Sequence, residues 1–242
     1  MIEKQNQKEK ELESKKFNID IKEMMKAGVH FGHQTSKRHP KMTPFIQGVR
    51  NSIHLIDLEK TAQFLKGALR FISESISEGK ILLFVGTKIQ HKNLIKEVAK
   101  ECGFPYITER WLGGTFTNFK IIKKRIEYFN DLKRKKEEGG FEKYTKKESA
   151  KLERELRNLE IKFGGIKDMA ELPDALFVVD MKKDAICVRE ARAKGVKVIG
   201  IADTNVDPSL ADYPIPANDD AMSSVKYILD KVKEVIKEAS NK

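Results

Sequence analysis

Short runs of apolar residues alternate with amphipathic stretches along much of the chain. The apolar run Ile81–Val85 is followed by Lys88–Lys100, where apolar residues recur at approximately helical spacing. A second run, Ala175–Val179, precedes a predicted helix at Asp184–Lys194, and Val196–Ile201 then predicts the next strand. The pattern therefore predicts strands that alternate with helices.

Apolar strands joined by helices are typical of a parallel sheet that is covered on both faces. We therefore predict an α/β fold with a doubly wound, mostly parallel sheet of the flavodoxin or Rossmann type. The last helix is expected at about Ala221–Glu238, with Asp219 or Asp220 capping its first amides.

A different pattern interrupts this alternation in the middle of the chain. Within 119–129 and again within 152–163, apolar residues recur three and four positions apart, which is the spacing of a coiled-coil seam. A polar link with Gly139-Gly140 separates the two stretches, and Thr145–Glu148 has the form of a helix capping box. The pattern predicts an antiparallel coiled-coil hairpin inserted into the α/β domain, with ordinary core helices as the alternative.

These patterns predict how the chain is divided. We expect an α/β domain formed by residues 17–115 and 164–242, and a coiled-coil insertion at 116–163. Residues 1–16 alternate Glu, Lys and Gln with almost no apolar residue, so they are expected to form a disordered arm. The same composition lacks the hydrophobic stretch of a signal peptide.

The charge balance predicts a polyanionic partner. The 242 residues include 47 Lys and Arg against 36 Asp and Glu, a formal net charge of +11, which suits nucleic acid or an acidic membrane surface. Residues 116–163 hold fifteen basic and nine acidic side chains, whereas 201–242 hold five and eight. No apolar run approaches the ~20 residues that span a bilayer, so a membrane role is not expected. The two cysteines have no paired spacing, which fits a reducing cytoplasm.

The sequence contains no complete catalytic motif. Gly86-Thr87-Lys88 follows a predicted strand but lacks the other glycines of a nucleotide-binding loop, and His30 and His33 lack the glutamate of a zinc hydrolase. We expect no enzymatic activity, no cofactor and no metal. Two alternatives stay open: an enzyme for a nucleotide or phosphorylated metabolite at Gly86–Lys88, and a protein-binding scaffold that uses the coiled coil.

Three aspartates leave a further question open. Asp180, Asp203 and Asp207 are expected near the carboxyl ends of parallel strands, where doubly wound folds place their ligands. A weak cation site is one reading of them, and turn-closing aspartates are the other.

Several motifs together resemble those of the bacterial small-subunit ribosomal protein S-two family, the universal uS-two family. They occur in family order from about Phe17 to Glu238. The stretches that carry the resemblance are Gly28–Thr35, Pro40–Ile46, Asn51–Lys60, Arg110–Thr115, Thr117-Asn118, Phe163–Met169, Leu172–Phe177, Asp203–Pro208 and Ile215–Ala221.

The resemblance implies a structural, non-catalytic constituent of the small ribosomal subunit, located in the cytoplasm. It implies an α/β domain that carries a coiled-coil hairpin, which agrees with the fold predicted from periodicity. It also implies partners: small-subunit rRNA, neighbouring ribosomal proteins, and ribosomal protein S-one.

Lysine and arginine clusters are the expected RNA contacts, because neutralising phosphates releases counterions. One cluster lies in the N-terminal loops and another on the first helix of the predicted hairpin, where a solvated helix face is the alternative reading. Trp111 is expected to fill the base of the hairpin. The predicted RNA-binding residues are His33, Arg38, His39, Lys41, Arg50, Lys88, Arg110, Lys120, Lys123, Lys124, Arg125, Lys133 and Arg134.

Overall fold

Five parallel strands form the central sheet of the protein. The structure is a computed structural model that describes residues 17 and 19–240; the arm expected at 1–16 lies outside them. The strands are β4 (Leu82–Val85), β5 (Tyr106–Ile107), β6 (Ala175–Val178), β7 (Lys197–Ala202) and β8 (Tyr213–Pro216). Their order is β5-β4-β6-β7-β8, with every pair parallel. Counted along the chain this is 2-1-3-4-5, the flavodoxin-like order, so the prediction of an α/β fold with a parallel sheet is confirmed.

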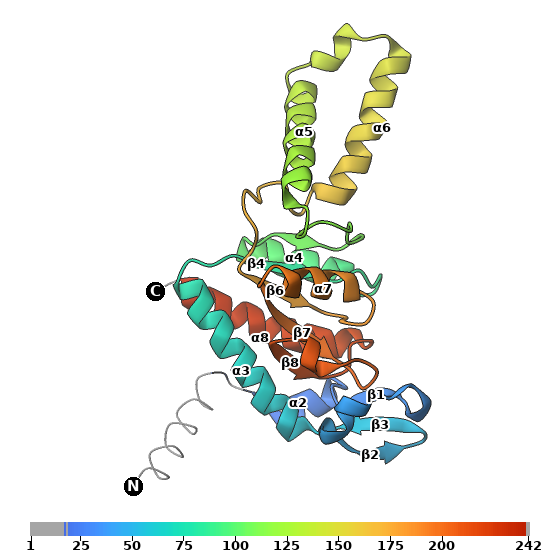
Figure 1. Ribbon diagram of the computed structural model, residues 1–242, viewed down its shortest axis with the longest axis vertical. Helices are drawn as coiled ribbons and strands as arrows, with labels where there is room; N and C mark the ends of the chain where they lie inside the picture. The colour runs from blue at the N-terminus through green and yellow to red at the C-terminus, as the bar shows by residue number, and fades with distance from the viewer. Residues whose placement is uncertain (1–16, 18, 241–242) are drawn as a thin grey trace.

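Alternate residues of each strand supply two separate cores. On β4, Leu82 and Phe84 pack into one cluster, and Leu83 and Val85 pack into another on the opposite face. The first face is covered by α3 (Leu58–Ser77), α4 (Lys92–Cys102) and α8 (Met222–Ser240), and α7 (Ala185–Ala193) covers the second. Figure 1 shows α3 and α8 lying side by side next to the sheet. Burial on both faces explains why these strands are continuously apolar.

A small antiparallel sheet at one end of the molecule was not predicted. It contains β1 (Phe31–Gln34), β2 (Ile46–Arg50) and β3 (Ile53–Ile56) in the order β1-β3-β2. Asn51 and Ser52 join β2 to β3 with positive φ angles of 50° and 62°, which fit the tight turn of a hairpin. The neighbouring elements are α2 (Ile21–Lys26) and the 3-10 turns η1 (Thr35–Lys37), η2 (Pro40–Phe45) and η4 (Pro208–Leu210).

Two long helices extend from the opposite end of the molecule (Figure 1). We call α5 (Phe119–Glu137) and α6 (Lys146–Phe163) the helix pair; the short turn η3 (Gly140–Lys143) lies between them. Ile122, Ile126 and Phe129 are buried, and they belong to the same apolar cluster as one face of the sheet. The Thr145 capping box is present, with both reciprocal hydrogen bonds to Glu148.

The structure corrects one predicted helix start and one predicted helix cap. The helix predicted at Lys88–Lys100 begins at Lys92, because residues 88–91 form a turn. At the start of α8, the side chain of Asn218 accepts hydrogen bonds from the amides of Asp220 and Ala221. The side chains of Asp219 and Asp220, which were predicted to cap this helix, contact Lys88. Among the described residues, no helix has the length and apolarity needed to cross a membrane.

Candidate nucleic-acid interface

The carboxyl ends of the parallel strands meet in a polar cluster organised by Lys88. Its ammonium lies 2.8 Å from a carboxylate oxygen of each of Asp180, Asp219 and Asp220. Lys88 follows β4 and Asp180 follows β6, so this ion pair lies at the point where the strand order reverses. Doubly wound folds usually bind their ligands there. Here a lysine ammonium lies among the carboxylates at that position.

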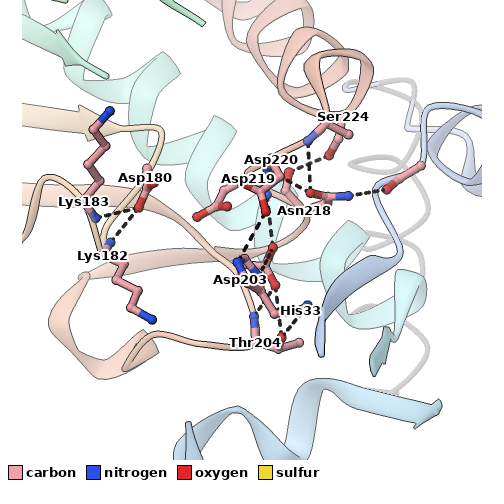
Figure 2. A network of polar contacts seen from close by, with 12 residues as sticks. His33, Asp180, Lys182, Lys183, Asp203, Thr204, Asn218, Asp219, Asp220 and Ser224 are labelled. Atoms are coloured by element: carbon pink, nitrogen blue, oxygen red, sulfur yellow. Dashed lines mark hydrogen bonds and ion pairs between the residues drawn. The ribbon is translucent and has the colours of Figure 1, made fainter. Parts of the chain in front are cut away.

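His33 joins the antiparallel sheet to this cluster. Its Nδ1 lies 3.1 Å from Asp203 and its Nε2 lies 3.3 Å from Asp220, while its backbone amide donates to the Thr204 hydroxyl at 2.9 Å. Figure 2 shows His33, Asp203 and Thr204 facing one another below Asp219. A Cβ at Gly32 would approach the Thr204 side chain to 2.6 Å, so this contact requires glycine beside His33.

Burial and crowded carboxylates shift the pKa values of the cluster. Burial, together with the charges of Asp180 and Asp203, raises the pKa of Asp219 to about 7. Burial alone would lower the pKa of Lys88, but its three carboxylate partners raise it, so the ammonium stays protonated. The hydrogen bond to Asp203 raises the pKa of His33. Lys88 is therefore a fixed cation and not a proton acceptor.

The arrangement of the aspartates differs from the three-aspartate site considered from the sequence. Asp207 lies apart from the cluster, and its carboxylate is 2.7 Å from the Lys41 ammonium. Burial alone would raise the pKa of Asp207, but Lys41 and Ser209 outweigh it and lower the pKa to about 2. Within the described part of the chain, the set that could hold a metal ion is His33, Asp203 and Asp219, whose ligand atoms lie within 4.8 Å of one another.

The candidate nucleotide loop has its donors occupied. The Thr87 amide and hydroxyl donate to the Asp184 carboxylate at 3.1 and 2.8 Å. A nucleotide-binding loop offers such donors to a phosphate, but here a buried carboxylate accepts them. A Cβ at Gly86 would also lie 2.3 Å from the Ile95 side chain, so this glycine permits packing of α4 against the strand.

The cations predicted in the N-terminal loops differ in their surroundings. Arg38 and Arg50 are exposed at the antiparallel sheet. Lys41, by contrast, pairs with Asp207, and His39 Nδ1 accepts from the Lys41 amide at 3.3 Å. Arg38 and Arg50 thus present their guanidinium groups on the surface, while Lys41 and His39 also join the loop to the sheet domain.

The turn that leads into the helix pair is built around a glutamate that the sequence reasoning missed. Glu190 of α7 is buried and accepts hydrogen bonds from Trp111 Nε1 and from the amides of Gly114, Phe116 and Thr117, at 2.8 to 3.2 Å. Burial opposes its ionisation, but these donors leave the pKa of Glu190 lowered. Trp111 is buried edge-on against Phe116, as expected of an architectural residue.

Most cations predicted on the first long helix are exposed. Lys120, Lys123, Lys124 and Arg125 are exposed on α5, away from its buried apolar residues. Of the residues further along, Lys133 is half-buried, and Arg134 is exposed and contacts Asp131 at 3.0 Å. Arg110, which precedes the Trp111 turn, is exposed as well.

Comparison with known proteins identifies the family. The sequence model described as Ribosomal protein S2 matches residues 24–239. The chain is 47% identical to the small ribosomal subunit protein uS2 of Coprothermobacter proteolyticus over 220 residues, which are 91% of this chain and 82% of that protein. It is 46% identical to the protein of the same name from Koribacter versatilis over 223 residues, covering 92% and 74%. The chain belongs to the ribosomal protein S2 family.

Membership of the S2 family decides between an enzyme and a structural protein. The family is a structural, non-enzymatic component of the ribosome, so the prediction that the chain is not an enzyme is confirmed. The resemblance noted in the sequence is confirmed by the same match. In this S2 family member, the contacts of His33 with Asp203, Asp220 and Thr204 join the antiparallel sheet to the strand ends of the central sheet.

Proposed function

We propose that this S2-family chain is a structural constituent of the small ribosomal subunit that binds small-subunit rRNA through exposed cations. The observation that carries the proposal is the contrast between two sets of lysines. In the described residues, Lys120, Lys123 and Lys124 of α5 form no ion pair, whereas lysines of the sheet domain such as Lys88 and Lys41 do. Unpaired ammonium groups are free to neutralise phosphates.

The helix pair acts in this proposal as a coiled-coil hairpin, residues 116–163, on the α/β platform formed by 17–115 and 164–242. Its apolar seam continues into the core, and the buried Glu190 carboxylate holds the turn at its base. These contacts support a stiff mounting, which presents α5 cations at a fixed angle. Arg38, Arg50 and Arg110 are the proposed additional RNA contacts.

Neighbouring ribosomal proteins are the second class of partner we propose, with the particle in the cytoplasm. Phe31 and Val49 on the antiparallel sheet are 45% and 56% exposed, and exposed apolar side chains suit a protein contact. Ribosomal protein S-one as one of these partners is supported by the family resemblance alone. Lys88, Lys41 and His33 serve mainly to brace the platform, because each contacts an aspartate carboxylate of the sheet domain. His39 contributes through its backbone amide, which donates to the Thr204 carbonyl at 2.8 Å.

Charge reversal on α5 tests the RNA-binding proposal. Changing Lys120, Lys123, Lys124 and Arg125 to Glu removes four exposed positive charges and adds four negative ones without touching the buried seam. We expect this variant to sediment mainly at the top of a lysate gradient, while the unchanged chain sediments with small-subunit particles.

A matched variant controls for charge alone. Lys22, Lys26, Lys66 and Lys226 lie on α2, α3 and α8, away from the helix pair, and have no ion pair among the described residues. Their reversal to Glu should leave incorporation close to normal. Normal incorporation of the α5 variant, with circular dichroism showing both variants folded, would refute the proposed interface.

A further inference from the structure

A cleft lies where the base of the helix pair meets α4 and the edge strand β5. Its volume is about 400 Å³, and its walls come from α4, from residues 106–109, from the second half of α5, and from the last turn of α6 with the residues that follow it. We call this cleft the base cleft. A second hollow of about 480 Å³ shares Lys100, Tyr106 and Lys167 with its lining.

Lysines dominate the walls of the base cleft. Those that line it are Lys96, Lys100, Lys133, Lys162 and Lys167. Within the part of the chain that the structure describes, the first four form no ion pair, and Lys167 only reaches Asp168 at 3.9 Å. Of the two glutamates in the same lining, Glu109 is paired with Lys92 at 2.5 Å, and Glu160 forms no ion pair among the described residues. The lining therefore has five lysines against one carboxylate without an ion pair, which leaves a net positive charge in the cleft.

The floor of the base cleft is preformed. The Tyr106 amide donates to the Gly165 carbonyl at 2.9 Å, and a Cβ at Gly165 would lie 2.1 Å from the Tyr106 carbonyl oxygen and 2.8 Å from its ring. Only glycine permits this approach. The half-exposed Tyr106 ring consequently lines both hollows at a fixed position.

We infer that the base cleft binds a single-stranded RNA segment, with phosphates on its lysines and an unstacked base against Tyr106. The inference rests on the proposed RNA-binding function and adds a second contact site to it. Sites for single strands combine a cationic groove with an aromatic surface for stacking, and the cleft has both. Lys133 belongs to α5, so the cleft continues the cationic surface of that helix. An acidic protein segment would use the lysines but leave the aromatic floor unexplained.

Neutralising the cleft lysines is the direct test. The cleft variant changes Lys96, Lys100, Lys162 and Lys167 to Gln, and the control variant changes Lys22, Lys26, Lys66 and Lys226 to Gln. The probe is a full-length transcript of small-subunit rRNA, and binding to the full-length protein is measured at several salt concentrations. We expect the cleft variant to bind at least about tenfold more weakly and to lower the slope of log K against log salt by about three, at roughly 0.7 per phosphate. The control should match the unchanged protein.

Lysine acylation of the unchanged protein gives an independent readout. RNA should protect Lys96, Lys100 and Lys162 from the reagent, while Lys22 and Lys226 stay reactive. If the unchanged protein binds the transcript, but the cleft variant binds equally well and the cleft lysines of the unchanged protein stay reactive in the complex, the cleft inference is wrong and the proposed function stands. If the unchanged protein shows no binding, the proposed function itself fails. Protection that appears only in assembled subunits, and never with naked rRNA, would assign the cleft to a protein partner and overturn the inference.

Discussion

At the residue scale, the strand-end cluster holds more carboxylates than Lys88 neutralises. Asp219 is 2% exposed and lies near Asp180 and Asp203, so its ionised form is disfavoured and its pKa is raised to about 7. In the unfolded chain an aspartate has a pKa of about 3.9. Between these two pH values, Asp219 is therefore protonated in the folded protein and ionised in the unfolded chain.

This difference predicts a pH dependence with a definite sign. Stability contributed by the protonated Asp219 is fully present below the unfolded pKa and is lost as pH rises through about 7. Relative to Asp219→Asn, the unchanged protein should lose on the order of 2 to 3 kcal/mol in free energy of unfolding between about pH 5 and 8, since one pKa unit is about 1.4 kcal/mol. Urea denaturation across that range measures it.

Two comparisons isolate the Asp219 contribution. His30 and His91 have pKa values lowered by burial, so their protonation at low pH lowers the free energy of unfolding, opposite to the effect of Asp219. Both histidines are present in the unchanged protein and in Asp219→Asn, so their contribution cancels when the two proteins are compared. Asp220 also contacts Lys88, but its pKa is lowered, which puts its effect below about pH 4. His33 contacts Asp220 and has a raised pKa, so Asp220→Asn should change only the part of the dependence that His33 contributes and leave the Asp219 loss between about pH 5 and 8 in place. A flat difference for Asp219→Asn would contradict the assignment.

Individual contacts were the hardest feature to predict. The candidate residues Lys88 and His33 were recognised, but their partners come from β6, β7 and β8 regions distant in the chain, so only the topology brings them together. Glu190 carried no signal, because a glutamate within an amphipathic helix is usually solvated. Its role depends on five donors from the Trp111 turn, about 75 residues earlier in the chain.

At the scale of elements, periodicity was a good guide where a segment buries a regular face. The apolar strands β4 and β6 and the helices α7 and α8 lie where the pattern predicts them. The antiparallel sheet was missed because its strands are short and mostly half-buried, with Val49 and Phe31 exposed and no Asn-Gly turn to mark the hairpin. Its structure is set by contacts with the strand ends, such as Gly32 against Thr204.

The capping box of α6 predicts a local effect at the far end of the helix pair. The Thr145 hydroxyl accepts a hydrogen bond from the Glu148 amide, and the Glu148 carboxylate accepts one from the Thr145 amide at 3.1 Å. Loss of a threonine N-cap costs about 1 kcal/mol, so Thr145→Ala should speed hydrogen exchange of the first-turn amides of α6 about fivefold. Exchange measured by mass spectrometry follows these amides separately from α7 and α8.

A second hydroxyl in the same helix controls for composition. Ser149 lies one turn into α6 and makes no side-chain hydrogen bond among those of the described residues. Ser149→Ala should leave exchange unchanged or slow it slightly, because alanine has the higher helix propensity. Equal acceleration in both variants would show that the cap contributes nothing.

At the scale of the whole molecule, the net positive charge is unevenly distributed along the chain. The formal net charge is +11, and residues 116–163 contribute +6 of it, whereas 201–242 contribute −3. The sheet domain pairs many of its lysines with carboxylates, and α5 leaves Lys120, Lys123 and Lys124 exposed. The helix pair, which extends from one end of the sheet domain (Figure 1), therefore carries a large share of the net positive charge in a short segment.

This distribution predicts how binding to rRNA depends on salt. If four to eight phosphates are neutralised, log K should fall with log salt at a slope of roughly −3 to −7, at about 0.7 to 0.9 per phosphate. Filter binding of the purified chain to small-subunit rRNA between about 50 and 200 mM salt measures the slope. A scaffold that binds other proteins through the apolar seam would show almost no slope. The charge reversal at Lys120, Lys123, Lys124 and Arg125 should make the slope shallower by about three or more, because each lost phosphate contact releases no counterions. An unchanged slope in that variant would show that the RNA contact does not lie on α5.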